Sequence, residues 1–321
     1  MSTQKVTLSN GIAQATVLPE IGGRIISFKS LGREWLWRNP SLVSEQYELL
    51  IQPEEARSAT TLGNWRNWGG DKSWPAPQGW STDQEWAGPP DPILDSGAYT
   101  ASVSPDQSTC HLVSLADPRT GLQIERTVSM RPGHAGLTVK TTMTNTSPTT
   151  RRWACWTVTQ VVADKNLGGH QARVVIDHED EDRQHVVLFA AVGQQTVRVD
   201  ANGNLEVPLE DVVAKVGFPS ASGVIRFVNE DGYYFQQSFA VDKAGIYPDK
   251  GSRAEVWMQF PVSAPIDSLQ GLTLDARLVE MECLSPLTTL RTGENVSLAV
   301  EWFVGEEDLL LESDPETSHH E

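Results

Sequence analysis

Two glutamates, Glu280 and Glu282, stand two positions apart in the run ARLVEMECL. Successive side chains of a β-strand point to opposite faces, so this spacing places both carboxylates on one face. Neighbouring carboxylates raise the pKa of at least one of them, which suits a general base near neutral pH. Glu255, in AEVWMQ, is a further candidate. Which of the three is the base stays open, and one of the pair is alternatively part of a structural salt bridge.

Asp71 and Lys72 form a second candidate pair, directly after Gly69 and Gly70. Their surroundings, residues 57–95, are rich in proline, which fixes φ and predicts a stiff loop. The same segment contains five of the eleven tryptophans: Trp65, Trp68, Trp74, Trp80 and Trp86.

An aromatic-lined loop with polar residues at its tip suits a carbohydrate. Sugars have apolar C–H faces that lie on tryptophan and hydroxyl rims that need polar partners. We therefore expect Trp74 to stack on the face of a sugar ring. We expect Asp71, Lys72 and Gln78 to form hydrogen bonds with its hydroxyl groups. The alternative is that the tryptophans cap an open end of the fold and that Asp71 and Lys72 form a structural ion pair.

Short, β-branched or aromatic runs separated by Gly, Pro, Asn and Asp must position these residues. They predict strands at 12–18, 24–28, 101–103, 123–130, 137–144, 153–161, 174–176, 186–189, 224–228, 233–239, 254–260, 276–283 and 296–303. Helical patterns are few, with a helical turn expected within Ser41–Leu50. The fold class is therefore all-β, an antiparallel sandwich or barrel.

The 321 residues contain 39% hydrophobic and 21% charged residues, enough for a real core. We expect a single domain over residues 1–304 and an acidic, fraying tail over 305–321. A net charge of −17 argues against nucleic acid and anionic membranes as partners. Three distant cysteines, with no signal core, favour a reducing cytoplasm. No metal or other cofactor is expected, and the oligomeric state stays open.

The chain resembles the galactose mutarotase-like (aldose 1-epimerase) superfamily. The resemblance lies in the ordered set VLPEIGGRIISFKSLGREWLWRNP, AEVWMQFP and ARLVEMECLSPLTTLRTGENVSLAVEWFV, where Thr292 replaces the family's usual proline. With NWGGDKSWPAPQ and YPDKGSRAEVW, the set looks like an uncharacterised branch, a domain of unknown function. The resemblance implies a large β-sandwich (supersandwich) with a sugar cleft on one sheet face.

The family's mechanism uses a glutamate base and a histidine acid. Glu282 matches the glutamate position slightly better than Glu280. The strand RRWACWTVTQV has no histidine and offers Gln160 instead, which binds hydroxyls but is no acid at neutral pH. Among the histidines present, His170 in NLGGHQARV is the one to test as an acid, against a plain loop role.

Positive groups are the other candidates for the missing acid or for an anion clamp. Arg24 has the best claim to the binding face, because the family uses an arginine nearby. Lys72 and Lys215 are further candidates, since a desolvated lysine titrates near neutrality. The alternative for all three is a salt bridge. Asp249, in a turn, is a further candidate acceptor for a sugar hydroxyl.

These features lead to one hypothesis and two alternatives. The hypothesis is a mutarotase- or epimerase-like isomerase acting on a small-molecule sugar or sugar acid. The first alternative is a non-catalytic carbohydrate-binding or sensing protein. The second is a lyase or hydrolase on the same scaffold that uses Asp71 and Lys72 with the glutamates. Fold alone does not choose among them.

Overall fold

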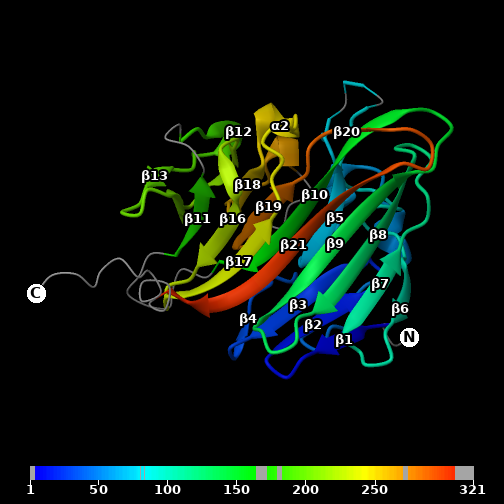
Figure 1. Cartoon of the computed structure of the whole chain (residues 1–321), viewed down its shortest axis with the longest axis horizontal. Helices are drawn as coiled ribbons and strands as arrows, with labels where there is room; N and C mark the ends of the chain where they lie inside the picture. Colours follow the sequence, from blue (N-terminus) through cyan, green and yellow to red (C-terminus); the bar gives the residue numbers. More distant parts are fainter. Residues whose placement is uncertain are drawn as a thin grey trace, which may run out of the picture.

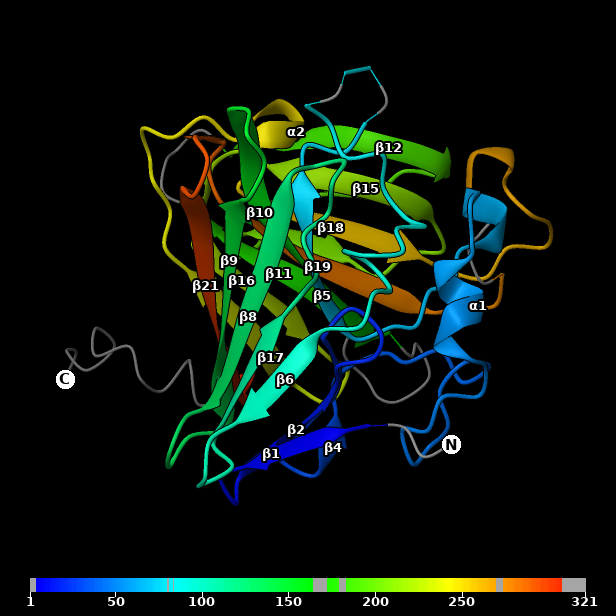
Figure 2. The ribbon, with the colours of Figure 1, turned by 90° about the vertical axis from the view of Figure 1, so that its right-hand side faces the viewer.

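The computed structural model describes residues 4–79, 81–82, 84–163, 172–178, 183–269 and 274–307. Within them the chain forms two large antiparallel sheets packed face to face (Figure 1). The view turned by 90° separates the layers, with β21, β9 and β8 on one side and β15, β18 and β19 on the other (Figure 2). The predicted all-β sandwich is confirmed.

The first sheet has eleven strands among the described residues. Its order is β1 (Val6–Ser9), β2 (Ala13–Leu18), β3 (Arg24–Ser30), β5 (Asp71–Ala76), β10 (Arg151–Val162), β19 (Leu278–Leu284), β18 (Ala254–Gln259), β15 (Val213–Phe218) and β12 (Val186–Val192). Off this path, β4 (Arg33–Glu34) pairs with β3 and β20 (Thr288–Leu290) pairs with β10.

The second sheet has ten strands in the same part of the chain. Its order is β13 (Arg198–Val199), β14 (Leu205–Pro208), β11 (Arg173–His178), β16 (Ala221–Val228), β17 (Tyr233–Phe239), β21 (Asn295–Glu306), β9 (Gly136–Asn145), β8 (Leu122–Met130), β7 (Thr109–Val113) and β6 (Thr100–Val103). Burial alternates strictly along β8 and along most of β21, because one face of this sheet meets the core and the other meets water.

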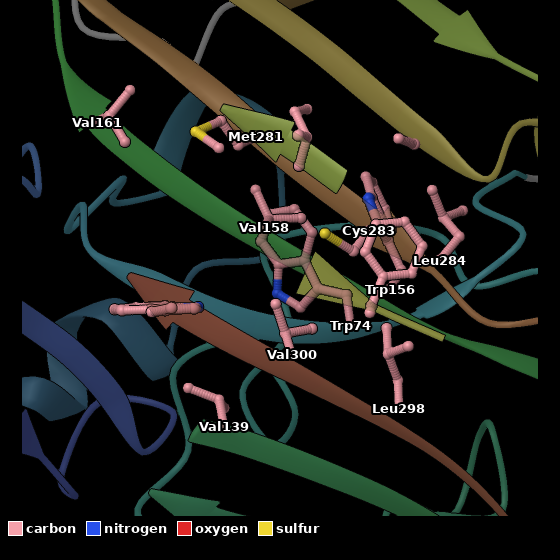
Figure 3. Close-up of a cluster of buried hydrophobic side chains, with 14 of the residues drawn as sticks. Trp74, Val139, Trp156, Val158, Val161, Met281, Cys283, Leu284, Leu298 and Val300 are labelled. Atoms are coloured by element: carbon pink, nitrogen blue, oxygen red, sulfur yellow. The ribbon is translucent and has the colours of Figure 1, made fainter. Parts of the chain in front are cut away.

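The core between the sheets is built from the inward-facing positions of both. Figure 3 shows Met281 and Cys283 of β19 with Leu298 and Val300 of β21. Met281 and Cys283 are the odd-numbered neighbours of Glu280 and Glu282, so the carboxylates lie on the opposite face of the first sheet.

The strand β5 corrects the prediction of a stiff loop. All six of its residues are buried, and it pairs with β10 along its whole length. It pairs with β3 only at Asp71, so the later residues have an unpaired side where Pro75, which lacks an N–H, is tolerated. A strand buried on both faces shows no polar alternation, and a proline within it makes its sequence resemble that of a loop.

The chain enters β5 through Gly69 and Gly70, with φ of +91° and +74°. A Cβ on Gly69 would lie 2.4 Å from the Trp37 carbonyl oxygen, and one on Gly70 would lie 2.3 Å from that of Ile25. Both positions therefore require glycine, because the backbone has a positive φ and the neighbouring chain leaves no room for a Cβ.

Helices are short in the described residues: α1 (Pro53–Arg57), α2 (Pro248–Gly251) and the 3₁₀ turns η1 (Leu62–Asn64) and η2 (Asp267–Leu269). The expected helical turn within Ser41–Leu50 is wrong. The helix begins later, at Pro53, where a proline at the first position and Glu54 and Glu55 in the first turn favour an N-terminus.

No described helix has the length and apolar character that crossing a membrane takes. The three cysteines are buried free thiols. β21 continues to Glu306, two residues past the predicted domain end. Most of the predicted acidic tail, residues 308–321, lies outside the described residues.

Candidate functional site

The register of five neighbouring strands gathers several of the predicted site residues on the outer face of the first sheet. Trp74 of β5 stands opposite Trp156 of β10, and Gln160 of β10 stands opposite Glu280 of β19. Directly paired residues of antiparallel strands share a face. Farther along, Glu282 faces Glu255 of β18, and Trp257 of β18 faces Lys215 of β15.

A cleft of about 300 Å³ opens over these strands. Its apolar lining includes Trp65, Trp74, Trp156, Phe189 and Trp257. Its polar lining is Asn67, Gln78, Lys215, Gln259, Glu280 and Glu282. Aromatic walls with a few convergent polar groups are typical of a small-molecule site.

Glu282 is the deeper carboxylate of the cleft, with its side chain 1% exposed. Its Oε2 accepts a hydrogen bond from the Trp156 indole Nε1 at 2.5 Å and lies 2.8 Å from the Lys215 Nζ. Its Oε1 is buried with no hydrogen-bond partner among the described residues. Burial raises the pKa of Glu282 above its ordinary value, although Lys215 opposes the shift.

Glu280 lies nearer the opening, with its side chain 13% exposed. Its Oε1 accepts a hydrogen bond from Gln160 Nε2 at 2.5 Å and lies 3.4 Å from Lys72 Nζ. The two-residue spacing thus places two carboxylates side by side in unequal environments. Glu280 pairs with Lys72 alone, whereas Glu282 shares Lys215 with Glu255.

Lys215 contacts two carboxyl groups. Its Nζ lies 2.5 Å from Glu255 Oε2 as well as 2.8 Å from Glu282 Oε2. Burial alone would lower the pKa of Lys215, but the two carboxylates raise it, so the ammonium stays charged. Burial raises the pKa of Glu255 strongly and that of Asp249, which is hydrogen-bonded to Glu255.

Two Lys–Trp–Glu groups sit next to each other on this face. Lys72 Nζ lies 4.5 Å from the centre of the Trp74 ring, and Lys215 Nζ lies 4.4 Å from that of Trp156. The two rings meet edge to face, 5.3 Å apart. Each lysine thus sits against an indole and a glutamate of β19, which fixes both tryptophans under the cleft.

Asp95 is a residue that sequence reasoning did not select. It accepts hydrogen bonds from Trp65 Nε1 at 2.9 Å and Trp74 Nε1 at 3.3 Å, and it pairs with Arg24 at 2.5 Å. It therefore orients two cleft tryptophans from behind. The available signal was its position at the end of the tryptophan- and proline-rich segment 57–95. Arg24 is fully buried in this pair, away from the predicted substrate-binding position.

Asp71 lies on the opposite face of β5 from Lys72 and Trp74. It points between the sheets, where it pairs with Arg126 of β8 and accepts a hydrogen bond from Thr159 at 2.7 Å. The prediction of Asp71 at a loop tip beside the ligand is therefore wrong, because strand alternation turns it into the core. Asp71 and Lys72 also do not pair with each other, since each has another partner.

Of the remaining predicted residues, Gln78 lines the cleft and Gln160 lies beneath it, bonded to Glu280. Lys72 is buried against Glu280 and Trp74. His170 lies outside the described residues. None of the described histidines lines the cleft. No cluster of three or more potential metal-ligating side chains is found in the described ranges.

A family model described as a domain of unknown function (DUF4380) matches residues 3–305. A comparison with curated proteins finds no match.

Similar solved structures include the Slr1438 protein from Synechocystis sp. PCC 6803, at 11% identity and a TM-score of 0.57, covering 96% of this chain and 97% of that one. A galactose mutarotase-like protein from Lactobacillus casei ATCC 334 is 11% identical, with a TM-score of 0.55 and coverage of 94% and 100%. A galactose mutarotase related enzyme from Lactobacillus acidophilus is 10% identical, with a TM-score of 0.54 and coverage of 95% and 98%. At these identities the likeness shows the fold, which is galactose mutarotase-like as the sequence motifs predict.

Proposed function

The chain belongs to the DUF4380 family of domains of unknown function and has a galactose mutarotase-like fold, and from this premise we propose that it binds a carbohydrate in the cleft and interconverts its anomers. The observation that carries the proposal is the cleft itself: tryptophan walls and two β19 carboxylates on one sheet face. Tryptophan stacks on the apolar face of a sugar ring, and carboxylates and amides bind its hydroxyls.

Anomer interconversion needs a base for the anomeric hydroxyl and an acid for the ring oxygen. Glu280 is the better base, because its side chain reaches the cleft while Glu282 is almost wholly covered. Gln160 and Lys72 hold Glu280 in place from the sheet side. This assignment favours Glu280 over Glu282 and over the fully buried Glu255.

One observation favours the non-catalytic alternative, a carbohydrate-binding or sensing protein. No described histidine lines the cleft, so the family's usual acid has no counterpart there. The lyase or hydrolase alternative depends on Asp71, and that carboxylate lies between the sheets.

Anomer exchange of free aldoses, followed by NMR exchange spectroscopy, tests the proposal. We expect exchange above the buffer rate, and a loss of about 10²- to 10⁴-fold in Glu280→Gln, since this is the usual contribution of a general base. Glu301→Gln, on an exposed position of the second sheet, is the matched control.

Two other outcomes separate the alternatives. Sugar-dependent quenching of tryptophan fluorescence with a raised melting temperature, but no exchange, identifies a binding protein. If no aldose or uronate of a test panel changes the fluorescence, the melting temperature or the exchange rate, both the enzyme proposal and the binding proposal are wrong.

A further inference from the structure

The cleft contains two groups of aromatic side chains. In the first, towards β5, the centre of the Trp74 ring lies 6.3 Å from that of Trp65 and 5.3 Å from that of Trp156. In the second, towards β12, the rings of Phe189 and Trp257 stack with their centres 5.6 Å apart and their planes at 29°. Phe189 and Trp257 lie on β12 and β18, far from the tryptophan-rich segment 57–95 in the chain.

The strand register places Glu280 between the two groups. Glu280 of β19 stands opposite Gln160 of β10 on one side and Trp257 of β18 on the other. Lys215 of β15 stands opposite Trp257, and Phe189 of β12 stands opposite Lys215. Because paired residues share a face, Trp257, Lys215 and Phe189 continue the row of Glu280 towards β12. The first aromatic group lies on the other side of β19, on β10, β5 and the chain before β5.

The row extends farther across the sheet than one sugar ring does. Trp74 on β5 and Trp257 on β18 are three strands apart, across β10 and β19. At the usual strand spacing their backbones are about 14 Å apart, and Phe189 lies two strands beyond Trp257. A pyranose is a single six-membered ring, which covers one aromatic ring. A sugar unit over Glu280 therefore leaves the Phe189–Trp257 pair for a second unit.

The second aromatic group is the more accessible of the two. Trp65, Trp74 and Trp156 are only 7%, 4% and 4% exposed, so little of their surface can meet a ligand. Phe189 and Trp257 are half-buried. A sugar needs an uncovered aromatic surface for its C–H face, so the Phe189–Trp257 pair is the stronger stacking surface of the cleft.

The two ends of the cleft differ in how they are closed. At one end β5 is buried along its whole length, and Gln78 and Pro89, which follow it in the chain, line the cleft. At the other end β12 is the last strand of the first sheet among the described residues, and none of its residues is buried. A chain of sugar units can therefore leave the cleft over β12, while its terminal unit lies towards β5.

We propose that Phe189 and Trp257 form a second sugar subsite, so that the substrates of the cleft are reducing disaccharides and longer glycans rather than free monosaccharides. The inference rests on the proposed anomer interconversion, which requires the reducing-end unit to lie over Glu280. The next unit then lies on the Phe189–Trp257 pair. Gln259, two residues after Trp257 on the same face of β18, lines the cleft and offers an amide to the hydroxyls of that unit.

The charges around the subsite favour a neutral second unit. Lys215 stands between Trp257 and Phe189 in the row, but its ammonium is already paired with Glu255 and Glu282. An apolar surface with an amide beside it suits the C–H face and the hydroxyls of an uncharged sugar.

Anomer exchange of a reducing disaccharide, compared with that of a monosaccharide, tests the subsite. We expect kcat/KM for at least one of cellobiose, maltose and lactose to exceed that for glucose by about tenfold, the gain that one well-placed aromatic contact gives. The rates come from NMR exchange spectroscopy on the reducing-end anomers. A ratio of one or less for all three disaccharides overturns the proposal.

Variants of Phe189 test whether its ring causes the preference. Phe189 is three strands from Glu280, on a strand with no buried residue. Phe189→Leu keeps an apolar side chain but removes the ring, so the ratio of the disaccharide kcat/KM to that of glucose should fall to about one. Phe189→Tyr retains a ring and should retain the ratio. Phe303→Leu, which removes an exposed ring that contacts Tyr234 on the second sheet, is the matched control and should not change the ratio.

Trp257→Leu is expected to lower the same ratio, and the Phe189 variants decide the question if Trp257→Leu fails to fold. A preference for the disaccharide that is the same in wild type and Phe189→Leu overturns the subsite.

Isothermal titration calorimetry with the same sugars separates this inference from the proposed function. Tighter binding of a disaccharide that is lost in Phe189→Leu, without anomer exchange in any of the proteins, supports the subsite and overturns anomer interconversion. Exchange with equal ratios in wild type and Phe189→Leu overturns the subsite and leaves anomer interconversion standing. If none of the sugars binds or exchanges, both are wrong.

Discussion

Lys215 is the residue on which the electrostatics of the site depend. It is the only cation that the two most deeply buried carboxyls of the described cleft region contact directly, and its ammonium also lies over the Trp156 ring. Removing it leaves Glu255 and Glu282 together in a low-dielectric interior. Removing one partner of a buried ion pair usually destabilises a protein more than replacing the whole pair by apolar residues does.

Lys215→Met is therefore expected to lower the free energy of unfolding by roughly 3–5 kcal/mol at neutral pH. Both glutamates have a folded-state pKa above the unfolded value, so their contribution is most favourable at acidic pH and is lost as the pH rises. The deficit of Lys215→Met should accordingly shrink towards pH 5. Urea unfolding at several pH values measures this, with the exposed Lys140→Met as control. A pH-independent deficit would contradict the account.

At this scale the sequence predicts some neighbours and misses others. The two-residue spacing is enough to place Glu280 and Glu282 on one face. Asp71 and Lys72 cannot both face a ligand from a strand, because adjacent strand residues point to opposite faces. Both were expected at the ligand only because the segment was predicted to be a loop. The meeting of Lys215 with Glu282 depends on the register of β15, β18 and β19, which no local pattern contains.

The element that most determines the site is β5. Its cleft-facing residues, Lys72 and Trp74, support the β19 carboxylate and the aromatic floor. Its core-facing Asp71 receives Arg126 from β8, so this ion pair ties the first sheet to the second. Arg126 also donates to the Gly23 carbonyl at 2.7 Å.

Arg126→Leu is expected to cost roughly 3–5 kcal/mol of unfolding free energy, because Asp71 would remain buried without its partner. The double variant Arg126→Leu with Asp71→Asn should recover part of that loss, since no unpaired charge remains. Arg131→Leu, which removes a surface pair with Glu301, is the matched control and should cost no more than about 1 kcal/mol. Strictly additive effects in the denaturation cycle would show that the two side chains are not coupled.

Strands that alternate or are rich in β-branched residues are predictable from the sequence, and β5 is a strand that this pattern misses. β8 and β21 alternate and match the predicted ranges closely. β5 is buried on both faces and contains Trp74 and Pro75, so its composition imitates a rigid loop. Pairing with β10 makes this segment a strand, and local composition does not reveal that pairing.

Across the whole molecule, charge opposes anionic ligands. The net charge is −17, and the three cations predicted as an anion clamp, Arg24, Lys72 and Lys215, are each paired with a carboxylate. Lys215 is the one cation that lines the described cleft, and two carboxylates already contact it. A phosphate or carboxylate on the sugar would have to displace them.

A neutral hexose should therefore bind at least about tenfold more tightly than its 6-phosphate or its uronic acid at low ionic strength, a difference of about 1.4 kcal/mol. Added salt screens the repulsion and should narrow the gap. Isothermal titration calorimetry on the same preparation measures both. Tighter binding of the sugar phosphate would mean that Lys215 leaves Glu255 and Glu282 to pair with the phosphate.

The all-β class followed from the strand patterns, whereas the sandwich with a cleft on one sheet face followed from the resemblance to the galactose mutarotase-like superfamily. The position of the cleft did not, because it depends on strands from residues 71 to 284 meeting side by side. That no histidine lines the described cleft is likewise not visible in any local pattern, because the residues that line the cleft come from distant parts of the chain.

The strict alternation of β19 between Met281 and Cys283 on one face and Glu280 and Glu282 on the other limits how this protein can evolve. Losing or gaining one residue in that strand would exchange the two faces, placing two carboxyls in the apolar interior and a thiol in the cleft. New specificities on this scaffold are therefore accessible by replacing side chains at fixed positions, while changes in length are confined to the connections between strands. Homologues aligned through this strand should differ in residue type but contain no gaps.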